Sequence, residues 1–142
     1  MKKLKFLALL FVAVSVGFTS CKKDDDAEID MAALKGTWQQ TKSVETYYDA
    51  KGKQISQETD TDFDSEYRLQ ITDNRLIYRG VYAENYRLDG DKIIATEIGG
   101  SNTSEYEIKV KKLTSTELVI EYEDLDDDGG REVTEETYKK VN

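Results

Sequence analysis

The side chains of this chain that could carry chemistry are few in kind. Cys21 is the only cysteine, and the 142 residues include no histidine. Without histidine, the chain cannot build a Ser-His-Asp or Cys-His catalytic group or a His-ligated metal site. The remaining groups are carboxylates, hydroxyls, amines and guanidiniums, and no spacing among the 29 acidic residues marks a catalytic carboxylate pair. The sequence therefore predicts a protein that is not an enzyme.

Cys21 follows a segment that has the three parts of an export signal. Residues 1–5 are short and basic, residues 6–18 form an uncharged apolar run, and Thr19 and Ser20 are small. The apolar run is shorter than the ~20 residues that a membrane-spanning helix requires. We therefore expect residues 1–20 to be a lipoprotein signal peptide that is removed. Cys21 then becomes the first residue and carries the lipid that attaches the protein to the membrane.

The residues directly after Cys21 are charged and form a tether up to residue 29. Residues 22–28 read Lys-Lys-Asp-Asp-Asp-Ala-Glu, and eight extended residues reach at most ~28 Å. A cysteine followed by lysines and aspartates resembles the sorting tag of some Gram-negative lipoproteins. That resemblance implies an outer-membrane protein displayed on the cell surface. The alternative is a solubilising spacer on a lipoprotein that faces the periplasm.

The charge of the chain excludes one class of partner. Removal of residues 1–20 takes away three lysines, so the net charge of −9 becomes −12 for the side chains of the mature protein. An acidic domain of this kind is repelled by phosphate backbones. We expect no binding to nucleic acid.

After a short helix at 31–35, capped by Asp30, the apolar pattern has a period of two, which is typical of half-buried strands. Short turns rich in Asp, Asn and Gly separate the segments. Because every connection is short, neighbours in sequence should pair as antiparallel hairpins. The sequence predicts an all-β domain over 30–142, an up-and-down meander that closes into a barrel of about eight strands. The expected strands are 38–48, 53–59, 67–71, 76–79, 86–88, 92–98, 106–110, 118–122 and 131–141.

A family resemblance adds to this reading. Gly36-Thr37-Trp38, behind a short helix and at the entry to the first strand, resembles the Gly-x-Trp motif of lipocalins, and 86–93 and 113–118 resemble segments of lipocalin-like domains in small bacterial lipoproteins. The resemblance implies that Trp38 plugs the closed end of a barrel that binds a small ligand. The chain departs from the family in two ways. It ends in strand-like sequence where lipocalins have a helix, and its Thr61-Asp62-Phe63 comes too early to match their late Thr-Asp-Tyr-like motif.

Tyrosines are the candidate ligand-binding residues. Tyr67, Tyr106 and Tyr122 fall on the apolar side of their strands, and Tyr78 is expected to join them. A barrel lined by Tyr, Leu and Ile offers apolar walls with hydroxyls that orient a small, partly apolar ligand. In the alternative, side chains fill the barrel, and the protein is a structural or protein-interaction module of the cell surface.

An acidic segment near the C-terminus has the spacing of a calcium loop. Asp124, Asp126 and Asp128 precede a glycine, and Glu135 follows at the twelfth position of the pattern. Alternate carboxylates in a tight turn offer the hard oxygen ligands that Ca²⁺ prefers. The flanking segments are predicted strands rather than helices, so the alternative is an acidic hairpin turn without a metal.

Overall fold

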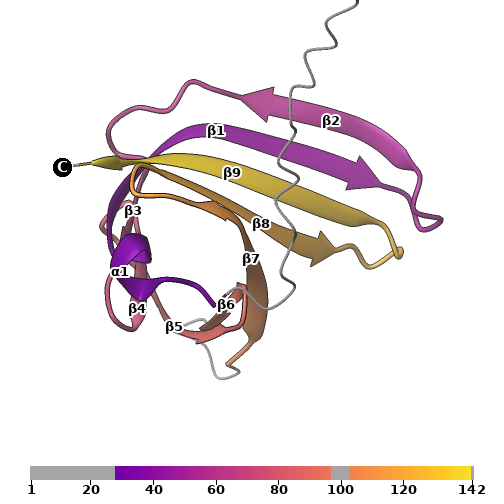
Figure 1. Cartoon of the computed structure of the whole chain (residues 1–142). Helices are drawn as coiled ribbons and strands as arrows, with labels where there is room; N and C mark the ends of the chain where they lie inside the picture. The colour runs from indigo at the N-terminus through magenta and orange to yellow at the C-terminus, as the bar shows by residue number, and fades with distance from the viewer. Residues whose placement is uncertain (1–27, 97–102, 142) are drawn as a thin grey trace, which may run out of the picture.

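A single antiparallel sheet of nine strands forms the fold in the computed structural model, which describes residues 28–96 and 103–141 (Figure 1). Asp30 caps the one helix of this part of the chain, and its carboxylate accepts hydrogen bonds from the backbone N–H groups of Ala32 and Ala33. No helix in these residues is long and apolar enough to cross a membrane. The elements are α1 (Met31–Leu34), β1 (Gly36–Tyr48), β2 (Gln54–Asp60), β3 (Arg68–Ile71), β4 (Arg75–Tyr78), β5 (Tyr82–Asp89), β6 (Lys92–Thr96), β7 (Glu105–Leu113), β8 (Glu117–Leu125) and β9 (Arg131–Val141).

Eight of the strands close into a barrel. β3 to β9 follow one another as antiparallel neighbours, β1 pairs with β3, and β9 returns to pair with β1. The β1–β9 pairing is long, with Thr37 opposite Val141 at one end and Tyr48 opposite Arg131 at the other. Closure removes the exposed edges that an open meander of this length would have. The predicted all-β class and the closed antiparallel barrel are confirmed.

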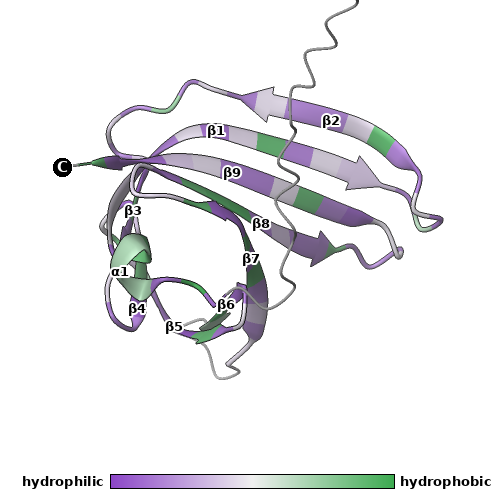
Figure 2. Cartoon of the chain, viewed as in Figure 1, coloured by the Kyte–Doolittle hydropathy of each residue, from purple (hydrophilic) through white to green (hydrophobic). Residues whose placement is uncertain are grey.

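The expectation that every strand pairs with its neighbour in sequence is wrong at β2. β2 pairs with the second half of β1, and β3 pairs with the first half of the same edge of β1, so β2 and β3 do not pair. The hydropathy of the side chains explains why β3, and not β2, completes the barrel wall. All seven residues of β2 are exposed, and Figure 2 colours the strand mostly as hydrophilic. In β3, Leu69 and Ile71 alternate with exposed residues and are buried in the core, so β3 takes the place in the barrel wall.

Part of the sheet projects beyond the barrel (Figure 1). The last pair between β7 and β8 is Lys109 with Glu121, so residues 122–125 of β8 pair only with β9. Residues 43–48 of β1 pair with β2 on one side and β9 on the other. We call the sheet made by 54–60, 43–48, 131–136 and 121–125 the four-stranded extension.

The apolar core closes the barrel at the end covered by α1. Trp38 and Leu34 are completely buried there, and the indole Nε1 of Trp38 donates a hydrogen bond of 2.8 Å to the Leu34 carbonyl. The ammonium of Lys140 lies 4.9 Å from the centre of the Trp38 ring and donates to the Ala33 carbonyl at 2.8 Å. These contacts fasten β1 and β9 to the helix. Trp38 thus lies at the closed end, where the sequence resemblance places it.

Gly36 adopts a backbone conformation that favours glycine. Its φ is +138°, and a Cβ placed there would lie 2.8 Å from Cε of Lys140. A positive φ costs an alanine about 1–3 kcal/mol at either Gly36 or Gly52. We predict that Gly36→Ala lowers the free energy of unfolding more than Gly52→Ala does in urea denaturation, because the new Cβ also displaces the Lys140 side chain from its contacts with Trp38 and Ala33. Gly52→Ala is the control, because Gly52 also has a positive φ of +78° but nothing lies within 4 Å of its Cβ position. Equal losses in both variants would show that the close contact between the Lys140 side chain and position 36 does not require glycine there.

Candidate functional site

Tyrosines from four strands that are not all adjacent in sequence gather on the inner face, where the barrel passes into the four-stranded extension. On β4, Tyr78 lies two residues after the buried Leu76, and on β7, Tyr106 lies two residues before the buried Ile108. On β8, Tyr122 lies two residues after the buried Ile120. Because side chains alternate along a strand, each tyrosine shares the inner face with its buried neighbour. Tyr138 on β9 is itself buried.

Glu136 is the carboxylate around which these tyrosines are arranged. Its Oε2 accepts a hydrogen bond of 2.6 Å from the Tyr138 hydroxyl, and its Oε1 accepts from Tyr122 at 3.4 Å and from Nε2 of Gln40 at 3.1 Å. Burial raises the pKa of Glu136, the nearby charge of Glu45 raises it further, and the three hydrogen bonds oppose the rise. A carboxylate in this setting is a strong acceptor that neighbouring donors hold in one position.

A second carboxylate joins the cluster from β5. Glu84 accepts a hydrogen bond from the Tyr106 hydroxyl, and a hydrogen bond links Tyr106 with Tyr78. Burial is the main cause that raises the pKa of Tyr78, Tyr106 and Tyr122, and the negative carboxylates add to it. These phenols therefore keep their protons at neutral pH and act as hydrogen-bond donors. We call Tyr78, Tyr106, Tyr122, Tyr138, Glu84, Glu136 and Gln40 the tyrosine–carboxylate cluster.

The structure brings together three of the four predicted ligand-binding tyrosines. Tyr78, Tyr106 and Tyr122 belong to the cluster. Tyr67 packs elsewhere, with its ring centre 5.3 Å from that of Phe63 and 4.6 Å from the guanidinium of Arg79. It precedes β3 rather than lying within it, so the period of the strand does not carry it into the cluster.

Sequence reasoning missed the other four members of the cluster, which are Gln40, Glu84, Glu136 and Tyr138. The period-two pattern of the last strand holds a signal, because Glu136 and Tyr138 alternate onto one face. A single glutamate in an acidic chain resembles a surface residue, and only the register that sets Glu136 opposite Ile120 shows that it faces inward.

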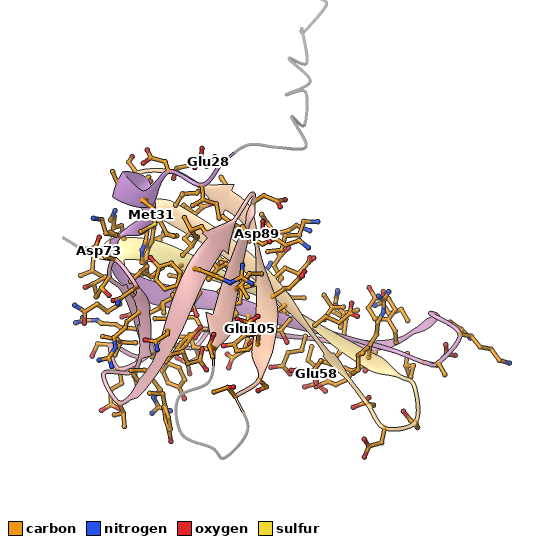
Figure 3. The ribbon with its side chains drawn as sticks, turned by 90° about the horizontal axis from the view of Figure 1, so that it is seen from below. Glu28, Met31, Glu58, Asp73, Asp89 and Glu105 are labelled. Atoms are coloured by element: carbon orange, nitrogen blue, oxygen red, sulfur yellow. The ribbon has the colours of Figure 1, made fainter. Side chains whose placement is uncertain are left out.

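The cluster lies away from the plugged end of the barrel. In Figure 3, Met31 and Asp73 mark the end covered by α1, whereas Glu105, the neighbour of Tyr106, lies towards the other end. Among the described residues, no buried side-chain polar atom lacks a hydrogen-bond partner. The cluster is therefore an organised set of donors and acceptors on an inner face that also carries the apolar core.

The acidic segment near the C-terminus forms the turn between β8 and β9. The backbone N–H of Asp126 donates a hydrogen bond of 2.9 Å to the Gly130 carbonyl across the turn, and Oδ1 of Asp128 accepts from the Gly130 N–H at 3.0 Å. Asp124 pairs with Glu132 on the inner face, whereas Glu135 pairs with Glu121 on the opposite face. In the described part of the chain, no three acidic, histidine or cysteine side chains are placed to hold a metal ion. The structure does not bring the four proposed calcium ligands together, and calcium binding stays a prediction.

The outer face of the sheet offers a groove of a different character. A depression of about 540 Å³ lies over β6 to β9, with Lys92, Glu107, Glu123 and Arg131 in its lining. Lys92 pairs with Glu107 at 2.5 Å, and Arg131 pairs with Glu123 at 3.0 Å. Two ion pairs between lining residues therefore neutralise part of this groove, whose lining also includes Lys109 and Glu121.

The sequence was compared with protein-family models and with curated proteins. No model of a protein family matches the chain, and no curated protein matches it. The proposed lipid attachment site, Cys21, lies outside the described residues, as do the signal peptide and residues 21–27 of the tether.

The raised pKa of Glu136 predicts a pH-dependent stability. The pKa of this carboxyl group is higher in the folded chain than in the unfolded chain. Such a group contributes its full stabilisation at a pH below its pKa in the unfolded chain. The contribution is lost as the pH rises through its pKa in the folded chain. We predict that the stability of Glu136→Gln relative to the native protein increases from pH 4 towards neutral pH, because glutamine does not ionise. Urea denaturation at several pH values measures the difference. Glu135→Gln, on the opposite face, is the control, and a constant difference for Glu136→Gln across this range would contradict the prediction.

Proposed function

We propose that this chain is a lipid-anchored, surface-displayed protein of the bacterial outer membrane whose lipocalin-like barrel binds a small, partly apolar ligand without catalysing a reaction. The observation that carries the binding proposal is the tyrosine–carboxylate cluster inside a barrel whose other end is plugged. A plug at one end directs access to the other end, and ligand sites in small barrels lie in their mouths.

The lipocalin-like assignment is supported by local geometry at the plugged end. Gly36 enters β1 beneath the side chain of Lys140, and Trp38 is buried between that lysine and the helix. This arrangement supports the proposal that Gly36-Thr37-Trp38 acts as the Gly-x-Trp motif of a lipocalin-like barrel.

The cluster defines the chemistry that a ligand would need. Aromatic rings and neighbouring Ile and Leu side chains offer an apolar wall, which favours a ligand with an apolar body. Glu136 and Glu84 are acceptors, and the phenols of Tyr78 and Tyr122 are donors held by burial in the protonated state. A ligand with hydroxyl or amide groups on an apolar frame matches this set.

A fluorescent probe tests the binding proposal. The neutral apolar dye Nile red should bind saturably, with increased and blue-shifted emission, because the tyrosine rings exclude water. Tyr122→Ala should weaken binding at least tenfold, whereas Tyr48→Ala should leave it within twofold, because Tyr48 lies on the outer face against Arg131. A ligand at 100 times its dissociation constant should also raise the free energy of unfolding by ~2.7 kcal/mol. No saturable signal, or equal loss in the two variants, would contradict binding in the cluster.

A separate variant tests the anchor. Cys21 is the only residue whose thiol can carry the lipid, so Cys21→Ser should move the protein from the membrane fraction to the soluble fraction of cells that export it. Lipid chains contribute ~0.8 kcal/mol for each buried CH₂, and the variant loses this contribution. Fractionation with immunodetection measures the outcome. A variant that stays integral to the membrane would contradict the lipoprotein assignment.

A further inference from the structure

β2 has an open edge. It is the only one of the nine described strands that pairs on one side alone, since the strand order begins with β2 and its single partner is β1. The edge is about 23 Å long, because each of its seven residues adds about 3.3 Å. A row of unpaired N–H and C=O groups of this length is a template for an added strand.

The edge lacks two of the features that block strand addition. β2 contains no proline and no lysine, and its own charges, Glu58 and Asp60, repel an acidic partner strand but not a basic one. The one irregularity in its pairing is opposite Tyr47 and Tyr48, at the hairpin end. From residue 56 to residue 60 the strand pairs regularly with β1. A partner strand would therefore meet a regular edge.

Negative charge gathers on one face beside this edge. In the register of the four-stranded extension, three rows of side chains share the face that continues the barrel interior. Their members are Asp60, Ser43, Glu136 and Ile120; Glu58, Glu45, Thr134 and Tyr122; and Ser56, Tyr47, Glu132 and Asp124. Six of these twelve residues are acidic and none is basic. One of the acidic residues, Glu58, is labelled on the projecting sheet in Figure 3. We call this surface the acidic face.

The carboxylates of the acidic face have no cationic partners in the described part of the chain. The ion pairs found there use other carboxylates. On the opposite face of the same strands, Glu121 pairs with Lys111 at 2.8 Å, and Glu123 pairs with Arg131. Ion pairs between described residues of the chain therefore neutralise two carboxylates of this opposite face and none of the acidic face.

The electrostatic effect is visible at Tyr47, in the middle of the acidic face. The hydrogen bond to Glu45, together with burial and the charges of Glu132 and Glu58, raises the pKa of Tyr47 to about 12. A second copy of the chain, paired edge to edge through β2, would place its own Glu58 and Asp60 on the same face and add to the repulsion. An oppositely charged strand would relieve it.

We propose that the open edge of β2 binds an extended segment of a partner protein that carries Lys or Arg at alternate positions. The segment adds to the sheet as a tenth strand through backbone hydrogen bonds. Its basic side chains point to the acidic face, where residues opposite one another on neighbouring strands have Cβ atoms about 4.5–5.5 Å apart. Glu58 and Asp60 are then the first carboxylates that these side chains meet. No residue of β2 belongs to the tyrosine–carboxylate cluster, although the acidic face shares Glu136 and Tyr122 with it. The proposal does not rest on ligand binding in the cluster.

Three peptides test the proposal by calorimetric titration into the purified chain. The first is a capped nine-residue peptide in which Lys alternates with Thr. The second has the same sequence with every backbone amide N-methylated, which keeps the charge and removes the hydrogen-bond donors from both edges of the peptide. The third has Glu in place of Lys. The first should bind saturably, the second at least tenfold more weakly, and the third not at all. Binding of the first should also slow amide hydrogen exchange in residues 54–60.

Two variants with equal changes in net charge give the matched control. Glu58→Gln/Asp60→Asn removes two negative charges from the acidic face, whereas Glu66→Gln/Asp73→Asn removes two negative charges from exposed positions outside the four-stranded extension. The first variant should weaken binding of the lysine peptide at least tenfold, and the second less than twofold. Failure of the lysine peptide to bind, equal binding of the methylated peptide, or equal loss in both variants would overturn the proposal. A dimer in sedimentation without peptide, with protected amides in 54–60, would assign the edge to a second copy and overturn it too.

Discussion

The pairing of β1 on both of its edges is the constraint on which the rest of the structure depends. One edge pairs with β9 from Thr37 to Tyr48, and the other edge pairs first with β3 and then with β2. The register to β9 shifts between Gln40 and Lys42, between the segment that faces β3 and the segment that faces β2. This irregularity lets one strand bend from the barrel wall into the projecting sheet, since bulges bend a strand and increase its twist.

The inner face changes character along the β1–β9 pair. It begins with the buried Trp38, continues through Gln40 opposite Tyr138 and Ser43 opposite Glu136, and ends with Tyr47 opposite Glu132. Apolar burial stabilises the plugged end. Towards the other end, each polar group needs a partner, because an unpaired buried polar group costs about 1–3 kcal/mol. The hydrogen bonds to Glu136 meet this need where the barrel passes into the extension.

Local pattern accounts for the parts of the fold that could be predicted from the sequence. The period of two predicts the strands, and Asp30 predicts the start of the helix. The position of Trp38 at a closed end is implied only by the resemblance of Gly36-Thr37-Trp38 to the Gly-x-Trp motif and not by a local pattern. The position of β2 depends on competition between two segments for one edge of β1, and no local pattern records such competition. The inward position of Glu136 depends on the register with β8. Tyr67 lies just before its strand, where alternation gives no direction.

The two proposed sites lie on one continuous electrostatic surface. Glu45 raises the pKa of the buried Glu136, and it also accepts the hydrogen bond from Tyr47 and lies opposite Glu58 on β2. A positive charge placed over Glu45 and Glu58 favours the ionised form of nearby carboxyl groups and so lowers the pKa of Glu136. The ionised form of Glu136 is the better acceptor for Tyr122 and Tyr138. Because β1 carries Gln40 of the cluster and also pairs with β2 at the open edge, a basic partner bound at that edge would strengthen the hydrogen bonds of Glu136 through its charge.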